Sequence, residues 1–198
     1  DSFAVGTTTV TYTATDIHGN SSTASFTITV TDDEDPSISG MPADITQTAD
    51  AGLCSAVVTW ADPSAADNCA VATFTSSHDS GDAFAVGTTT VTYTATDIHG
   101  NTTTSTFDVT VTDDEDPAIS GMPADISQTN DATLCGAVVT WTAPTTTDNC
   151  GATLTSTHNP GDLFAVGTTT VTYTSTDAAN NTATASFNVV VTDGEAPV

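Results

Sequence analysis

The sequence predicts an all-β protein made of tandem immunoglobulin-like β-sandwich domains, arranged as beads on a string. Three observations predict it: apolar residues alternate with Thr at a period of two, long segments recur every 80 or 81 residues, and no stretch has helical periodicity. Six or seven short strands in about 80 residues are typical of such a sandwich. The 37% of hydrophobic residues are enough to build a core.

Internal repeats set the expected domain organisation. The segment AVGTTTVTYTATDIHGN at 4–20 recurs letter for letter at 85–101 and, with changes, at 165–181. The acidic DDEDP serves as the boundary between repeats. We expect the C-terminal part of a truncated repeat at 1–31, complete repeats at 32–112 and 113–192, and the start of another repeat at 193–198. Because these ends are out of phase with the repeats, the chain is expected to be an excerpt from a longer array.

Alternation within one repeat locates the strands. In 89–96, Val, Tyr and Ala alternate with Thr, which predicts a half-buried strand. The turn that follows has Gly100, which suits positive φ, and Asn180 takes its place in the third copy. Trp60 and Trp141 end the second strand and are expected to pack in the core. The expected strands are 37–47, 54–60, 71–77, 83–86, 88–96 and 103–112, with a short extra strand near 77–82.

The charge balance excludes several classes of function. The chain has 25 acidic residues and no Lys or Arg, for a formal net charge of −25. Nucleic-acid binding and a basic membrane-docking face both need cationic side chains, so neither is expected. No apolar stretch has the roughly 18 residues of a membrane span. Four Cys in a repeated spacing favour an oxidising compartment, which predicts an extracellular or cell-surface location.

Recurring spacing within the repeats carries a resemblance to a known family. The runs V-x-W-x-x-P-x-x-x-DNC, F-A-V-G-TTT-V-T-Y-T-A-T-D-x-x-G-N and F-x-V-x-V-T-D resemble the hyalin repeat (HYR) domain over the whole chain. This resemblance implies an immunoglobulin-like fold in extracellular, adhesive, repetitive proteins without catalytic activity. The matching positions are Trp60, Pro63, Asp67, Asn68, Cys69, Phe84, Gly87, Tyr93, Asp97, Gly100 and Asn101.

The cysteines leave two pairings open. Many hyalin repeats have a further Cys pair where this chain has Met41 or Met122 and residues around Ser25, so the resemblance implies that Cys54–Cys69 and Cys135–Cys150 remain. Each such bond closes a loop of about 15 residues, for roughly 3 kcal/mol of stabilisation. We favour this pairing, although Cys54 and Cys69 belong to opposite ends of an ideal sandwich and a disulfide needs Cα atoms within about 7 Å. The alternative is Cys54–Cys150, which joins one repeat to the next.

Acidic residues gather at one end of each predicted domain. Seven of the twelve acids of repeat 32–112 belong to the first strand's start, the loop between the second and third strands, and the last hairpin turn. Carboxylates at this density, without cationic neighbours, suit Ca²⁺, which takes six to eight oxygen ligands. The seven acids are Asp32, Asp33, Glu34, Asp35, Asp62, Asp67 and Asp97. The candidate ligands are all of these except Asp62, together with Asn68, Asp113, Asp114, Glu115, Asp116, Asp148, Asn149 and Asp177.

The hairpin turns also contain acceptor sequences for N-linked sugar. Asn20 and Asn101 begin N-x-[ST] sequons, and Asn180 restores one in the third copy by a shift of one residue. The sequon acts as a signal only in a secretory context. Glycosylation is therefore a hypothesis that depends on the predicted extracellular location.

A structural and adhesive role is the leading functional hypothesis. The chain is expected to form a calcium-stiffened stalk, fibre or surface filament, with neighbouring repeats, other copies in a fibre or surface glycans as partners. We expect no enzyme activity, because near-identical copies with no nucleophile, base or phosphate-binding motif indicate a scaffold. The alternatives are a glycan- or ice-binding adhesin module, through the Thr rows, and a passive spacer of a larger secreted enzyme.

Overall fold

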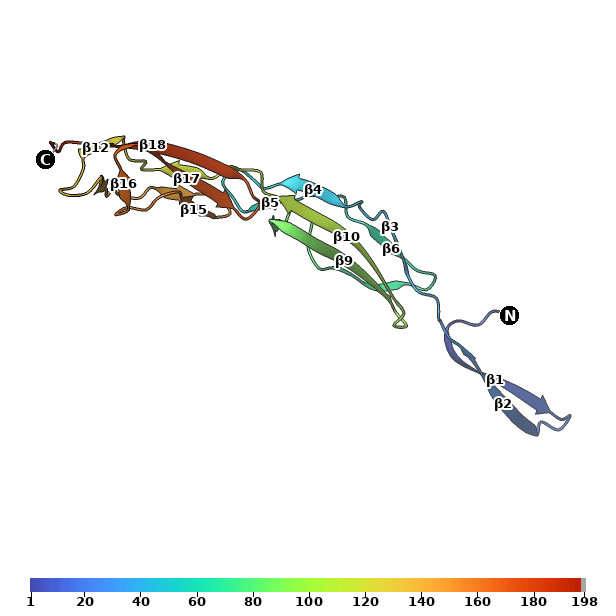
Figure 1. Ribbon diagram of the computed structural model, residues 1–198. Helices are drawn as coiled ribbons and strands as arrows, with labels where there is room; N and C mark the ends of the chain where they lie inside the picture. Colours follow the sequence, from blue (N-terminus) through green and yellow to red (C-terminus); the bar gives the residue numbers. More distant parts are fainter. Residues whose placement is uncertain (197–198) are drawn as a thin grey trace. The chain divides into compact units, whose positions relative to one another are not determined.

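The computed structural model describes residues 1–196, in which every regular element is a β-strand (Figure 1). The chain divides into two compact units. The first unit consists of Asp1–Ala43, Trp60–Ser80 and Thr90–Phe107. The second consists of Asp44–Thr59, Gly81–Thr89 and the residues from Asp108 onward, and it therefore contains the whole repeat 113–192.

Repeat 113–192 has one four-stranded sheet and two small strand pairs. The strand order of the sheet is β12 (Ile126–Thr129), β18 (Thr182–Thr192), β17 (Gly167–Asp177) and β15 (Ala152–Ser156). The pairing of β12 with β18 is parallel, whereas β18 with β17 and β17 with β15 are antiparallel. The small pairs are β11 (Ala118–Ser120) with β14 (Thr145–Thr147) and β13 (Gly136–Val138) with β16 (Leu163–Ala165).

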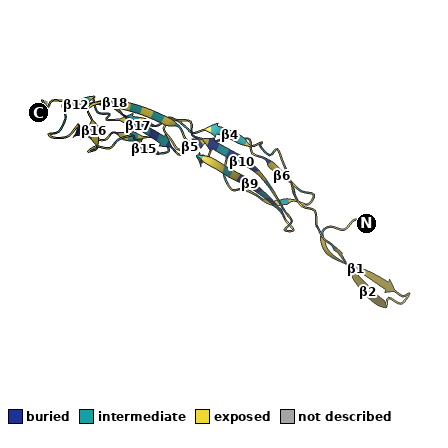
Figure 2. Cartoon of the chain, in the orientation of Figure 1, coloured by how far each residue is buried: buried dark blue, intermediate teal, exposed yellow. Residues whose placement is uncertain are grey.

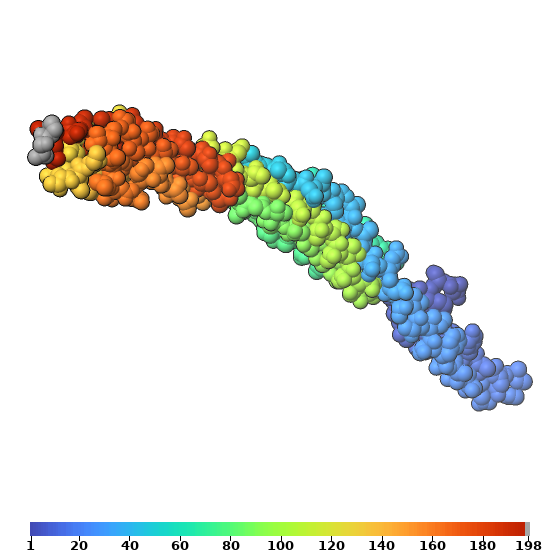
Figure 3. All heavy atoms as spheres, in the orientation of Figure 1, coloured from blue at the N-terminus to red at the C-terminus, as the bar shows by residue number. Residues whose placement is uncertain are grey.

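The core of this repeat lies between the large sheet and the β13–β16 pair. Alternate residues of β17 and β18 are buried and form one cluster with Ala137 of β13 and Phe164 of β16. Trp141 packs against this cluster, and its Nε1–H donates a hydrogen bond of 2.8 Å to the Tyr173 hydroxyl. The all-atom view shows the residues of this repeat, coloured yellow to red, as one closely packed body (Figure 3). The period-two pattern thus forms an immunoglobulin-type sandwich, as the sequence predicts.

The same strand order recurs in repeat 32–112. Its four-stranded sheet has the order β4, β10, β9, β7, with β4 and β10 parallel, and its small pairs are β3 with β6 and β5 with β8. The strands are β3 (Ser37–Ser39), β4 (Ile45–Thr48), β5 (Ser55–Val57), β6 (Ser64–Ala66), β7 (Val71–Ser76), β8 (Ala83–Ala85), β9 (Gly87–Asp97) and β10 (Thr102–Thr112).

Four strand predictions for this repeat are wrong in detail. The strand expected at 54–60 ends at Val57, so Trp60 lies after this strand and not at its end. The expected strand 37–47 is interrupted after β3 at Gly40, which has φ of 75°, and at Pro42, which has no backbone N–H to donate. The short strand β6 was not expected, because its Ser and Ala residues carry no strand signal. The segment 77–82, which the structure describes, contains no strand, so the extra strand expected there is absent.

The prediction of positive φ at the hairpin turn is confirmed, with 98° at Gly100 and 72° at Asn180.

The first 30 residues form a hairpin of β1 (Gly6–Thr15) and β2 (Ser21–Val30). The side chains of this hairpin are largely exposed (Figure 2), with Tyr12 67% and Phe26 49% exposed. The equivalent Tyr93 and Phe107 in β9 and β10 are each only 4% exposed. Since residues 4–20 and 85–101 are identical, the difference between Tyr12 and Tyr93 arises from their packing partners and not from the sequence around them.

Candidate metal centre

The turn after each long hairpin strand is built around one Asp. Asp97 Oδ1 accepts hydrogen bonds from the backbone N–H groups of His99, Gly100 and Asn101, and Oδ2 accepts one from the Asn101 side chain at 2.8 Å. Burial is the largest single influence on this carboxyl and raises its pKa, but the hydrogen bonds from Asn101 and its neighbours together hold the pKa of Asp97 below its ordinary value. The turn therefore holds a buried, ionised carboxylate.

The equivalent turn of the next repeat holds Asp177 through the corresponding Asn. The backbone N–H and the side-chain Nδ2 of Asn181 donate to Asp177 Oδ1 and Oδ2 at 2.8 and 2.7 Å. Asn181 Nδ2 also donates to the carbonyl oxygen of Asp113 at 3.2 Å, so the turn contacts the acidic segment that connects the two repeats. Sequence reasoning did not assign this positioning role to Asn101 or Asn181, although the Asp-x-x-x-Asn spacing of an Asx-type turn is visible in the sequence.

A second acidic group comes from the Asp-Asn-Cys loop, which precedes β7 in one repeat and β15 in the next. Asp148 Oδ2 accepts a hydrogen bond from the Cys150 backbone N–H at 2.8 Å, and Asp67 Oδ2 accepts the same bond from Cys69 at 2.8 Å. This closes a tight Asx turn and leaves the other oxygen of each carboxylate unused. Both unused oxygens, Asp67 Oδ1 and Asp148 Oδ1, are buried and have no hydrogen-bond partner among the described residues.

A third carboxylate comes from the acidic segment between the repeats. In the second compact unit this is Asp113, which is 8% exposed. Its Oδ1 accepts hydrogen bonds from the Glu115 backbone at 3.2 Å and from Asn149 Nδ2 at 3.1 Å. Within residues 1–196 its Oδ2 is buried without a partner, and so is Asn149 Oδ1.

These three sources meet in one cluster in each unit. Oxygen atoms of Asp113, Asp148 and Asp177 all lie within 4.8 Å of one another, and so do those of Asp32, Asp67 and Asp97. At this separation each pair of like charges repels by about 1 kcal/mol in a water-like dielectric and more in a protein interior. No Lys or Arg exists anywhere in the chain to compensate the charge.

The donor set indicates which ligand such a cluster can hold. Buried carboxylates and carbonyl groups without partners are costly unless a proton donor or a cation satisfies them. The unsatisfied atoms at Asp113, Asp148 and Asn149 are all oxygens, the ligand type that Ca²⁺ and Mg²⁺ prefer. The residues therefore fit a hard divalent cation.

The first unit differs in having a thiol and an imidazole beside its cluster. His99 Nδ1 lies 3.0 Å from Asp32 Oδ2, and Cys69, Asp32 and His99 also form a close group. The hydrogen bond from Cys69, joined by those from Glu34, His99 and Asn68, lowers the pKa of Asp32. In return, the Asp32 carboxylate raises the pKa of Cys69 to about 11. Cys69 therefore stays a protonated thiol at neutral pH.

The remaining candidate ligands lie outside the two clusters of the described chain. Glu34 accepts a hydrogen bond from Asn68 Nδ2, and Glu115 accepts one from the Gly52 backbone. Asp62, an acid of this end that is not a candidate ligand, accepts a hydrogen bond from the Tyr93 hydroxyl. The others are exposed acids of the connecting segments: Asp33, Asp35, Asp114 and Asp116. In each DDEDP run the first Asp and the Glu thus enter hydrogen-bonded structure, and the other acids face solvent.

Comparison with known proteins identifies the family. The HYR domain profile matches residues 1–30, 31–111 and 112–191. The chain belongs to the HYR domain family.

Relatives of this HYR chain include two proteins named hyalin. The one from Lytechinus variegatus is 44% identical and the one from Strongylocentrotus purpuratus 40% identical, each over the full length of this chain. The chain spans 39% and 17% of the length of these relatives. Among solved structures, an extracellular fragment of protocadherin gamma B2 aligns with 96% of this chain and 61% of its own, at 16% identity and a TM-score of 0.37. No helix among the described residues is long and apolar enough to cross a membrane.

The disulfide pairing favoured from the sequence is wrong for this HYR chain. Cys54 is bonded to Cys150, with Cα atoms 4.7 Å apart, and so joins repeat 32–112 to repeat 113–192. Cys69 and Cys135 are free thiols. Beside the bond, Asn149 Nδ2 donates to the Leu53 carbonyl, so the loop before β15 lies against the loop before β5. The Gly52 N–H donates to Glu115 of the connecting segment.

The sequon residues of the HYR turns differ in their surroundings. The Asn20 and Asn101 side-chain nitrogens, which would carry a sugar, each donate to the Asp four residues earlier in the chain. Asn101 Nδ2 donates also to the Asp32 carbonyl oxygen. Asn180 is exposed and precedes Asn181, which makes the equivalent contacts in its repeat.

Proposed function

We propose that this HYR chain is a structural, adhesion-type extracellular protein whose consecutive repeats are fixed to one another by a bound divalent cation, with Ca²⁺ as the ion. The observation that carries the proposal is the Asp113–Asp148–Asp177 cluster with its buried oxygens that lack partners among the described residues. The HYR family and the inter-repeat disulfide support a scaffold role.

The cluster is placed where an ion would fix one repeat to the next. Asp113 directly follows β10, the last strand of repeat 32–112, whereas Asp148 and Asp177 belong to repeat 113–192. An ion held by all three carboxylates would tie the connecting segment to two loops of the following repeat. The Asn149 side-chain oxygen is available as a fourth ligand atom. Ca²⁺ suits this set because it accepts six to eight oxygens in flexible geometry, whereas Mg²⁺ requires a near-ideal octahedron.

Cation binding also removes the electrostatic cost of the cluster. Without an ion, three carboxylates repel one another at a junction that is otherwise held by one disulfide and a few hydrogen bonds. With an ion, the repulsion becomes attraction to a common centre. A ligand that binds only the folded state stabilises that state by about 2.7 kcal/mol when the free ligand concentration is one hundred times Kd.

Thermal unfolding of the oxidised chain tests the proposal. In millimolar CaCl₂ we expect a Tm several degrees above that in a calcium chelator, with a smaller effect of MgCl₂. Asp148→Asn removes one ligand charge at nearly constant volume and is expected to reduce the calcium-dependent increase. Asp114→Asn alters an exposed acid next to Asp113 in the connecting segment and serves as the matched control. Equal Tm values with and without calcium would contradict the proposal.

A further inference from the structure

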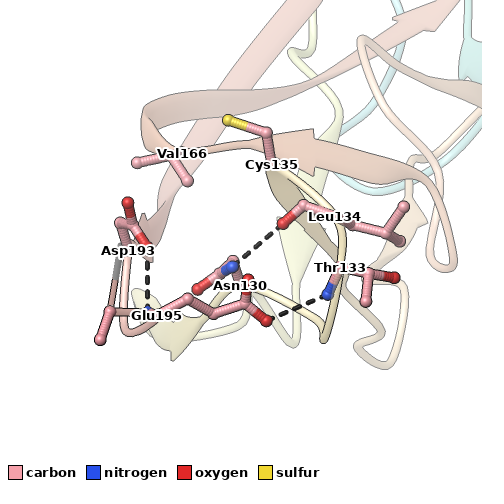
Figure 4. A pocket seen from close by; sticks show the side chains of 8 residues that line it. Asn130, Thr133, Leu134, Cys135, Val166, Asp193 and Glu195 are labelled. Atoms are coloured by element: carbon pink, nitrogen blue, oxygen red, sulfur yellow. Dashed lines mark hydrogen bonds between the residues drawn. The ribbon is translucent and has the colours of Figure 1, made fainter. Parts of the chain in front are cut away.

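Residues at the end of repeat 113–192 line a pocket, which we call the Cys135 socket. It corresponds to the pocket beside Cys54 where repeat 113–192 meets repeat 32–112, which we call the occupied junction. Figure 4 shows this socket, with Cys135, Val166 and Asp193 around its rim and the Cys135 sulfur clear of the other side chains drawn. The equivalent residues at the occupied junction are Cys54, Val86 and Asp113, which line a pocket together with residues of the following repeat, Cys150, Ala178 and Ala179.

Backbone conformation and hydrogen bonding agree between the two places. The loop before Cys54 contains Gly52 with φ of 72°, and the loop before Cys135 contains Thr133 with φ of 68°. Left-handed φ is unfavourable for a β-branched residue such as Thr, so packing and hydrogen bonding hold this loop in shape. The backbone N–H of Gly52 donates to Glu115 Oε2 at 3.0 Å, and that of Thr133 donates to Glu195 Oε1 at 3.0 Å.

The two places differ in what contacts the loop. At the occupied junction, Asn149 Nδ2 donates to the Leu53 carbonyl and Cys150 completes the disulfide. At the socket, the Leu134 carbonyl accepts instead from Asn130 Nδ2 of its own repeat at 3.0 Å. A carbonyl oxygen has two acceptor positions, so Leu134 retains the capacity to accept a second donor.

The complementary part is present elsewhere in the chain. In the loop Asp67-Asn68-Cys69 the backbone N–H of Cys69 donates to Asp67, as that of Cys150 donates to Asp148. Cys69 is exposed and free, as Cys135 is. The described part of the chain thus has one occupied pair of loop and socket, one free loop and one free socket.

We propose that the Cys135 socket binds the Asp-Asn-Cys loop of a further repeat of the same kind in tandem, and that Cys135 forms a disulfide with the cysteine of that loop. By the same relationship, Cys69 bonds the socket cysteine of a repeat placed before it. The inference concerns a covalent interface and is independent of any bound cation.

The bond forms by thiol–disulfide exchange with a small disulfide such as oxidised glutathione. The two protein thiols lose two protons and two electrons as their S–S bond forms. The S–S bond of the oxidant breaks, and two molecules of its thiol are released with those protons and electrons.

A chain extended by one repeat tests the inference. A second copy of residues 119–198 is joined after residue 198, which continues the period. Cys69→Ser, and the same change in the added copy of Cys135, leave only Cys135 and the added copy of Cys150 as thiols outside the Cys54–Cys150 bond. After equilibration in a glutathione buffer, we expect peptide mapping to join these two within one molecule. Their equilibrium constant is expected to lie within about tenfold of that for Cys54–Cys150 in the same molecule.

Two controls make a negative result decisive. The Cys54–Cys150 bond of the same molecule reports that the original junction is folded, and hydrogen exchange of the added copy reports that the new repeat is folded. With both folded, free thiols at Cys135 and the added cysteine would overturn the proposal. A bond between two molecules would also overturn it, because the proposed occupant lies in tandem.

Discussion

The side chain of Asn149 donates a hydrogen bond to the backbone carbonyl of Leu53 at 3.1 Å, although 96 residues separate them in the chain. The same nitrogen lies 3.1 Å from Asp113 Oδ1. One amide therefore contacts both the loop before β5 and the connecting segment. The next residue, Cys150, forms the disulfide. Asn149 is thus the centre of the contact between the two repeats.

Replacement of Asn149 by Ala is expected to weaken the junction. It removes both hydrogen bonds and leaves the Leu53 carbonyl without this donor, at a cost of about 1–2 kcal/mol. The Cys54–Cys150 bond should therefore become easier to reduce by roughly tenfold in a glutathione titration. Asn68→Ala is the matched control, since Asn68 occupies the same loop position but donates its side-chain hydrogen bonds to Glu34 and Asp32. An equal effect of the two substitutions would contradict this role of Asn149.

Cys69 is expected to react slowly with alkylating agents. Its pKa is raised to about 11 by the Asp32 carboxylate, so only a small fraction is thiolate at pH 8. In the presence of a chelator, Asp32→Asn should lower this pKa and accelerate alkylation of Cys69 several-fold. Cys135 in the same molecule provides the reference rate, and mass spectrometry of the two peptides gives both. An unchanged ratio of the rates would show that Asp32 does not control the thiol.

The turn at Asp16 provides a pH test outside the candidate metal clusters. The Asn20 side chain, with backbone groups of Asn20 and His18, lowers the pKa of Asp16. Because the pKa in the folded turn lies below the unfolded value, this contribution to turn stability is complete above the unfolded pKa. It is lost as the pH falls through the folded pKa. NMR titration should find Asp16 below 3.8, and Asn20→Ala should raise its pKa toward that value.

Sugar attachment is expected to differ among the sequons. A glycan on Asn101 Nδ2 would take away one of the hydrogens that it donates to Asp97 and to the Asp32 carbonyl. Asn180 is exposed and has no such role in the turn, which Asn181 fills. When the chain passes through a eukaryotic secretory pathway, glycopeptide mapping should find higher occupancy at Asn180 than at Asn101. Equal occupancy would contradict this interpretation of the turn.

The fold was predictable because its determinants are local. Alternation around Val91 and Tyr93 and the turn at Gly100 specify the long hairpins, and the structure confirms both. Interruption of the first strand at Gly40 and Pro42 was also visible in the sequence but was outweighed by the apolar residues around it. The parallel pairing of Ile45 with Val109 depends on a contact between residues far apart in the chain, which no local pattern encodes.

The candidate site was predictable only in part. The three acids that meet in each unit were all among the expected ligands, because the sandwich places a strand start, a loop and a turn at one end. Their unsatisfied oxygens and the positioning by Asn181 depend on side-chain geometry. The Cys54–Cys150 bond depends on how the end of one repeat meets the start of another, and the sequence of one repeat contains no such information.

The most direct test of the central claim is calorimetric titration of the oxidised chain with Ca²⁺. We predict that Asp148→Asn binds one cation fewer per chain than the natural sequence, whereas Asp116→Asn, which alters an exposed acid outside the clusters, binds the same number. Identical stoichiometry and affinity for the natural chain and Asp148→Asn would contradict a metal site at Asp113, Asp148 and Asp177.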